Sequence, residues 1–268
     1  MIRPRVAAPV VLLVVLTACG GGSEPVAAVK PSPSVAAQPS PLDSKEGRLR
    51  LESGVSVFYR CVGRGSPGIL LEAGDAGTQE FGPSFVDPLA KATRVCTYDR
   101  PGIGSSDAAP NRHRTVDDLC EVEDQVRHGL GLDVKTVLAG QSGGANQVIW
   151  CAARRPAAVA ALMSIEGYHD DPAKLAKEFG PDGGWQNGGE YIDWVKSSVM
   201  LEKMPKPIGK FPVLVISASN ADPGGVKNQW YWLALSPRSR QVVLQGGHNL
   251  HREVPDQVTA EILHDLPR

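Results

Sequence analysis

Short apolar runs alternate with helix-like segments through most of this chain of 268 residues. The runs have the length of strands, and the segments between them repeat apolar residues at spacings of three and four, as one face of a helix does. Alternating strands and helices predict a mostly parallel sheet covered by helices on both faces. The expected strands are 68–74, 94–99, 134–140, 159–166, 211–218 and 240–245, and the expected helices are 83–92, 115–130, 143–155 and 226–235, with a last helix opened by Pro255.

Two segments depart from this alternation. Residues 48–62 form a short alternating pattern broken at Ser53-Gly54, which predicts a hairpin. Residues 168–208 contain clustered glycines and prolines, charged patches, Trp185 and Trp194, and we interpret them as a small lid inserted after a strand. Both tryptophans fit either of two roles, lining of an acyl pocket and packing of the lid itself.

The first residues indicate export. Arg3 and Arg5 precede an apolar run over residues 6–16, which is too short to span a bilayer and is typical of a secretory signal. The run ends in Leu16-Thr17-Ala18-Cys19, which resembles the bacterial lipobox; ordinary cleavage with an incidental cysteine is the alternative. The lipobox implies lipidation of Cys19, which would anchor the protein to the outer face of the cell membrane or cell envelope. We therefore expect a signal peptide over 1–18, a flexible tether over 19–46 and a folded domain over 47–268.

The charge balance excludes one class of partner. The chain has 28 basic and 29 acidic residues, so it lacks the basic surplus typical of proteins that bind nucleic acid.

The segment Gly140-Gln141-Ser142-Gly143-Gly144 carries the strongest indication of chemistry. It matches G-x-S-x-G and lies between an expected strand and an expected helix. A serine at such a turn has a strained backbone, and only residues without bulk two places before and after it let strand and helix approach. We predict that Ser142 is a nucleophile.

A serine hydroxyl needs an adjacent base, and His248 fits that role. It follows Gly246-Gly247 directly after an expected strand, where the carboxyl ends of parallel strands form ligand sites. Asp222 also follows an expected strand, so Ser142, Asp222 and His248 occur in the chain order Ser, Asp, His. A metal site built on His248 and His251 is disfavoured because no further ligands are evident.

Residues 47–268 resemble the α/β-hydrolase superfamily. The matching pieces are 70–77, 98–107, 140–144, 212–216 leading to Asp222, and 247–255. The resemblance implies a mostly parallel eight-stranded sheet with helices on both faces and a small lid, a Ser-His-Asp triad, and an oxyanion hole made by the N–H groups of Gly143 and Asp75. It implies no metal or organic cofactor.

The chain departs from this pattern at two places. Many relatives have His-Gly where this chain has Ala73-Gly74, and Asp75 then puts a carboxylate beside the oxyanion. The interval from the strand to Asp222 is one residue longer than usual, so Glu166 or Asp170 could be the acid instead. We interpret Asp99 and Arg100 as part of a turn whose charges pair locally.

Four cysteines lie in the expected domain. If the fold is as expected, Cys61 and Cys96 lie on neighbouring strands, and Cys120 and Cys151 lie on neighbouring helices. Export then predicts two disulfides, Cys61–Cys96 and Cys120–Cys151; small buried hydrophobic residues are the alternative.

We therefore expect a serine hydrolase that cleaves a small ester. An aminopeptidase-like hydrolase that binds a substrate amine through acidic lid residues is the first alternative. A surface-binding lipoprotein that kept the fold and lost turnover is the second.

Overall fold

The computed structural model describes residues 42–267 except 111, 181–184, 188 and 221–224. The expected signal peptide, Cys19, most of the expected tether and Asp222 lie outside the described residues.

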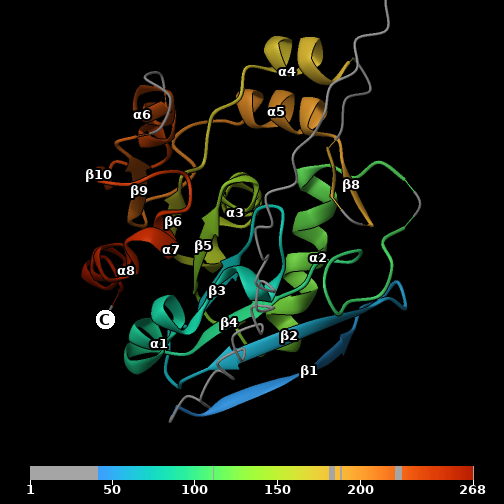
Figure 1. Cartoon of the computed structure of the whole chain (residues 1–268), viewed down its shortest axis with the longest axis vertical. Helices are drawn as coiled ribbons and strands as arrows, with labels where there is room; N and C mark the ends of the chain where they lie inside the picture. Colours follow the sequence, from blue (N-terminus) through green and yellow to red (C-terminus); the bar gives the residue numbers. More distant parts are fainter. Residues whose placement is uncertain (1–41, 111, 181–184, 188, 221–224, 268) are drawn as a thin grey trace, which may run out of the picture. The chain divides into compact units, whose positions relative to one another are not determined.

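Eight strands form one sheet in the order β1-β2-β4-β3-β5-β6-β9-β10 (Figure 1). The strands are β1 Ser44–Arg50, β2 Ser56–Val62, β3 Ile69–Glu72, β4 Val95–Tyr98, β5 Thr136–Gln141, β6 Val159–Ile165, β9 Val213–Ala218 and β10 Ser239–Leu244. β1 and β2 form the expected antiparallel hairpin, and β2 is antiparallel to β4. All other neighbouring strands are parallel. The first strand begins at Ser44, three residues before the expected start of the domain at Gly47.

Helices cover both faces of this sheet, as expected. They are α1 Pro83–Ala92, α2 Val116–Gly129, α3 Gly143–Arg154, α6 Gly225–Asn228, α7 Leu250–Glu253 and α8 Pro255–His264, with short 3-10 turns η1 Thr78–Glu80, η2 Pro156–Ala158 and η3 Gln229–Leu235. Leu70 and Leu138 point to the layer that α2, α3 and η3 cover. Their strand neighbours Leu71 and Val137 point to the opposite layer, under α1 and α8. Strands buried on both faces explain why their sequences are continuously apolar.

The expected lid segment folds into its own small elements. They are α4 Pro172–Phe179, the hairpin of β7 Trp185–Asn187 and β8 Glu190–Ile192, and α5 Trp194–Lys203. Figure 1 shows α4 and α5 lying next to each other, beyond the sheet. None of the helices in the described part of the chain is long and apolar enough to cross a membrane.

One of the two expected disulfides is present. Cys61 and Cys96 face each other on β2 and β4 and are bonded. The prediction of a Cys120–Cys151 disulfide is wrong: both side chains are free, buried thiols, although they contact each other. Burial raises the pKa of the Cys151 thiol well above its ordinary value, which disfavours the thiolate needed to form a disulfide.

Candidate active site

Ser142 occupies the sharp turn between β5 and α3. Its backbone has φ 55° and ψ −126°, a left-handed conformation that costs a non-glycine residue free energy. Gly140 and Gly144, two residues before and two residues after Ser142, occupy positions where a side chain would have no room. A Cβ on Gly140 would lie 2.3 Å from the carbonyl oxygen of Gly144, and a Cβ on Gly144 would lie 2.4 Å from that of Glu72. The turn therefore has the strained strand–helix geometry expected of a nucleophile.

Glu166 is the acid that the described residues bring to His248. Its Oε2 lies 3.3 Å from Nδ1 of His248 and accepts a hydrogen bond from the Tyr168 hydroxyl at 2.9 Å. Its Oε1 accepts hydrogen bonds from the Ala218 N–H at 2.6 Å and from Gln229 Nε2 at 2.9 Å. Burial alone would raise the pKa of Glu166, but these hydrogen bonds outweigh it and lower the pKa. Glu166 is thus an ionised carboxylate directed at the imidazole.

His248 lies at the edge of the sheet that carries Ser142. Gln141, the residue before the serine, donates a hydrogen bond from Nε2 to the His248 carbonyl oxygen at 3.3 Å. In the part of the chain that the structure describes, the Ser142 hydroxyl itself has no hydrogen-bond partner. A hydrogen bond between this hydroxyl and Nε2 of His248 would complete a triad of serine, histidine and acid, because Glu166 contacts Nδ1.

His251 is committed to a different part of the molecule. Its Nε2 lies 2.9 Å from Oε1 of Glu80, and its ring packs edge-on against Phe81 and Phe85. Within residues 42–267, gaps aside, no three histidine, cysteine or acidic side chains are placed to hold a metal ion.

The two expected oxyanion donors line one pocket with the serine. Gly143 is the first residue of α3, and Asp75 follows β3. Neither N–H donates a hydrogen bond within the described residues, so both are available to a ligand. The Asp75 side chain is exposed. Partial desolvation nevertheless raises its pKa, and Arg100 opposes this rise, so a carboxylate beside the expected oxyanion site is easier to neutralise than an ordinary one.

The pocket beside Ser142 has a volume of about 270 Å³. Acidic and aromatic side chains from the lid line much of it, together with Asn146 of α3, whose buried Oδ1 has no hydrogen-bond partner among the residues that the structure describes. Burial and the charge of Glu178 raise the pKa of Asp170 to about 6. The described residues that line it are Asp75, Ser142, Gly143, Asn146, Tyr168, Asp170, Leu175, Glu178, Phe179 and Trp194. The pocket suits a small ligand, and none of these described lining residues is basic.

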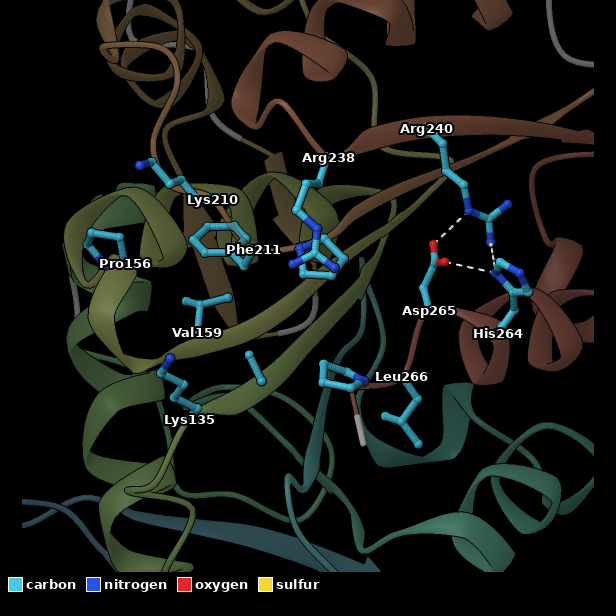
Figure 2. A pocket seen from close by; sticks show the side chains of 13 residues that line it. Lys135, Pro156, Val159, Lys210, Phe211, Arg238, Arg240, His264, Asp265 and Leu266 are labelled. Atoms are coloured by element: carbon cyan, nitrogen blue, oxygen red, sulfur yellow. Dashed lines mark hydrogen bonds and ion pairs between the residues drawn. The ribbon is translucent and has the colours of Figure 1, made fainter.

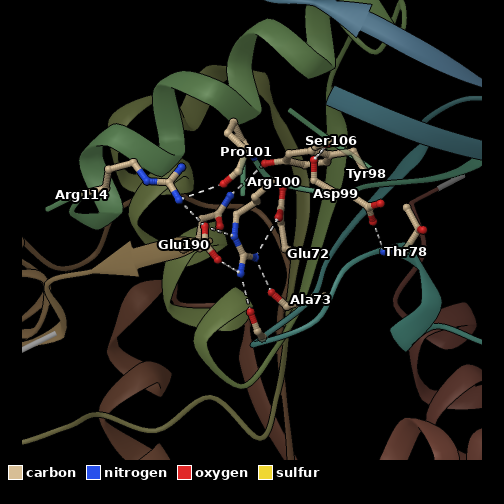
Figure 3. Close-up of polar contacts among 12 residues, drawn as sticks. Glu72, Ala73, Thr78, Tyr98, Asp99, Arg100, Pro101, Ser106, Arg114 and Glu190 are labelled. Atoms are coloured by element: carbon tan, nitrogen blue, oxygen red, sulfur yellow. Dashed lines mark hydrogen bonds and ion pairs between the residues drawn. The ribbon is translucent and has the colours of Figure 1, made fainter. Parts of the chain in front are cut away.

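Arg100 does not pair locally, contrary to the sequence interpretation. Its buried guanidinium donates hydrogen bonds to both carboxylate oxygens of Glu190 in β8 at 2.9 Å (Figure 3). It also donates to the backbone carbonyls of Ala73 and Gly74, just before Asp75. The Asp99 carboxylate accepts hydrogen bonds from the N–H of Ser105 in the same turn and from the N–H of Thr78, 21 residues earlier in the chain.

Figure 2 shows the lining residues of a second and larger pocket, which has a volume of about 520 Å³. Its lining residues Lys135, Val159, Phe211 and Arg238 stand at or just before the amino ends of β5, β6, β9 and β10. The pocket therefore takes no part in the arrangement around Ser142, which lies at the carboxyl end of β5.

Comparisons with known proteins agree with this architecture. A sequence profile of a family described by the alpha/beta hydrolase fold matches residues 69–188. No curated protein matches the chain. Similar solved structures include a thermophilic esterase from Thermogutta terrifontis (18% identity, 82% of this chain and 97% of that chain, TM-score 0.65) and an enol-lactonase from Burkholderia xenovorans (19%, 82% and 99%, 0.64). A serine hydrolase involved in carbazole degradation is also similar (20%, 84% and 99%, 0.63). The chain has the α/β-hydrolase fold.

Proposed function

We propose that this chain is a serine hydrolase that cleaves a small ester, with Ser142 as nucleophile, His248 as general base and Glu166 as the acid that orients the imidazole. The observation that carries the proposal is the contact of Glu166 with His248 at the sheet edge where Ser142 stands on its strained turn. The matched family profile and the esterase and lactonase neighbours support a hydrolase.

The proposed reaction proceeds through an acyl-enzyme. Ser142 Oγ attacks the ester carbonyl carbon while Nε2 of His248 takes the hydroxyl proton, a step worth about 10²–10⁴-fold in rate. The N–H groups of Gly143 and Asp75 stabilise the oxyanion. The carbon–oxygen bond to the alcohol then breaks, and the alcohol leaves with the proton from His248. Water repeats the two steps, releasing the acid and restoring Ser142.

Hydrolysis of an amide or ester substrate that carries a positively charged amine is a second candidate function. Three carboxyl groups and three aromatic rings line the pocket beside Ser142, and an ammonium group binds well to both kinds of side chain. This composition favours the aminopeptidase-like alternative more than the sequence alone did.

Turnover assays separate these readings. We expect the purified protein to hydrolyse p-nitrophenyl acetate, and Ser142→Ala to reduce the rate to background. Faster turnover of aminoacyl p-nitroanilides than of matched neutral esters would favour the second candidate. If the folded protein hydrolyses neither class of substrate, this would contradict the proposed hydrolase activity and favour the surface-binding alternative.

We also propose that the protein is exported and held to the membrane by a lipid on Cys19. The basic residues, the apolar run and the lipobox-like sequence before Cys19 support this. Wild-type protein should partition into the detergent phase of Triton X-114, and Cys19→Ser should remain in the aqueous phase. Partition of both proteins into water would contradict the anchor.

A further inference from the structure

We propose that Arg100 is a positioning residue for the oxyanion hole, holding the peptide that presents the Asp75 N–H, and that the lid residue Glu190 holds Arg100 in turn. The inference rests on the proposed function and adds a residue from outside the proposed triad. It also links the lid to the reaction centre.

The direction of one peptide group carries the argument. Arg100 donates from Nη1 to the Ala73 carbonyl at 2.6 Å and from Nη2 to the Gly74 carbonyl. The peptide bond between Gly74 and Asp75 is trans, and in a trans peptide the C=O and the N–H point in opposite directions. With the Gly74 carbonyl fixed on Arg100, the Asp75 N–H faces away from the guanidinium. In this direction the Asp75 N–H can point into the pocket that Asp75, Ser142 and Gly143 line.

The loop before Asp75 approaches the serine closely. A Cβ on Gly74 would lie 3.0 Å from Cβ of Ser142 and 3.2 Å from the Gln141 carbonyl oxygen. A rotation of this peptide therefore moves the donor directly relative to the nucleophile. Oxyanion donors act only within hydrogen-bond distance of the developing charge, so a displacement of this kind lowers the rate of the chemical step.

Glu190 supplies the charge that keeps Arg100 in place. The Arg100 side chain is 3% exposed, and a buried guanidinium requires an ionised partner. Glu190 contacts it through both oxygens at 2.9 Å, whereas the nearest Glu72 oxygen is 3.9 Å away. Burial raises the pKa of Glu72 well above its ordinary value, which favours its neutral form. The lid carboxylate is thus the counterion of Arg100.

Arg114 provides a matched control. Like Arg100 it is buried and binds Glu190, with Nη2 2.8 Å from Oε1, and it also donates to the Pro101 carbonyl at 3.1 Å (Figure 3). Among the described residues, no hydrogen bond joins Arg114 to Ala73 or Gly74. Replacing Arg114 therefore weakens the attachment of β8 without releasing a hydrogen bond to the oxyanion loop directly.

The test compares Arg100→Lys with Arg114→Lys in the full chain. A lysine has one ammonium group and cannot span both carbonyls and both oxygens of Glu190. We expect Arg100→Lys to lower kcat on p-nitrophenyl acetate by about 10²-fold with KM changed less than about threefold, the effect of losing one oxyanion donor. We expect Arg114→Lys to lower the melting temperature comparably while keeping kcat within about threefold of wild type. Unchanged kcat in folded Arg100→Lys, or an equal loss of kcat in both variants, would overturn the proposal.

Two further measurements keep the test decisive. If Arg100→Lys does not fold, Glu190→Gln takes its place, because it removes the counterion while keeping the side-chain shape. A fall in kcat at constant KM then supports the proposal, and an unchanged kcat overturns it.

A trifluoromethyl ketone forms an adduct that carries an oxyanion. It should bind the tested variant less tightly than the wild type, in parallel with the fall in kcat/KM, and unaltered binding would overturn the proposal. Absence of covalent labelling of Ser142 by a fluorophosphonate in the wild type would refute the proposed function itself, whereas a labelled wild type together with an unchanged kcat in Arg100→Lys refutes only this inference.

Discussion

The carboxylate of Glu166 contacts Nδ1 of His248, 82 residues further along the chain, at a distance of 3.3 Å. Glu166 follows β6 and His248 follows β10, so two strands of one sheet deliver the pair to the same edge. The acid is completely buried, whereas the imidazole is partly exposed. A fixed carboxylate of this kind selects the imidazole tautomer that leaves Nε2 free to accept a proton.

The first prediction concerns this acid. Glu166→Gln should lower kcat for ester hydrolysis by about 10³- to 10⁴-fold, because the amide cannot stabilise the protonated imidazole and favours the wrong tautomer. Asp222→Asn is the control, and it should keep kcat within about threefold of wild type. Steady-state kinetics on both folded variants measures this. A large loss in Asp222→Asn with little in Glu166→Gln would restore Asp222 as the acid.

The sequence indicates a candidate nucleophile and a candidate base more sharply than a candidate acid. Ser142 carries a local motif, and His248 directly follows both a strand and two glycines, so short-range rules point to each. An acid after either of two adjacent parallel strands reaches the same edge of the sheet, so chain order alone could not separate Glu166 from Asp222. The left-handed backbone of Glu166, φ 52°, has no signature in the sequence.

A second prediction tests the space at the nucleophile turn. Gly144→Val should destabilise the protein by several kcal/mol, or prevent folding, because even its Cβ would lie 2.4 Å from one backbone oxygen and 2.6 Å from another. Gly82→Ala is the control, since a Cβ there meets nothing within 4 Å. Urea unfolding compares their free energies. Equal stability of Gly144→Val and the wild type would show that the turn can relax.

Long-range pairs are what local sequence rules miss. The strands, the helix over residues 83–92 and the lid follow from periodicity and from glycine and proline placement. Asp99 and Arg100 adjoin each other in sequence, yet Asp99 binds the N–H groups of Ser105 and Thr78, whereas Arg100 binds Glu190, 90 residues away in the lid. Only the packing of β8 against the domain decides this.

A third prediction follows from the cysteines. Denatured, unreduced Cys19→Ser protein should titrate two thiols with Ellman's reagent, those of Cys120 and Cys151, because Cys61 and Cys96 are bonded. Replacing both bonded cysteines by serine should lower the free energy of unfolding by about 2–4 kcal/mol. Four titrated thiols would contradict the Cys61–Cys96 bond, and none would restore the second disulfide.

A fourth prediction concerns stability and pH. Burial between α2 and α3 raises the pKa of Glu123 to about 7, so the folded protein holds this proton more tightly than the unfolded chain does. The contribution of Glu123 to stability is therefore fully present below about pH 4, the unfolded value, and falls as the pH rises to about 7, by up to about 3 kcal/mol. Glu123→Gln should flatten the stability curve between pH 5 and 7 in urea unfolding. An unchanged slope would show that Glu123 titrates normally.

Activation of Ser142 is tested most directly by covalent labelling with a fluorophosphonate and mapping of the labelled peptide by mass spectrometry. We expect one label per chain on Ser142, none on Ser142→Ala, and labelling slowed at least about 10²-fold in His248→Ala. Absence of label on the folded wild type, or label that persists in Ser142→Ala, would contradict it.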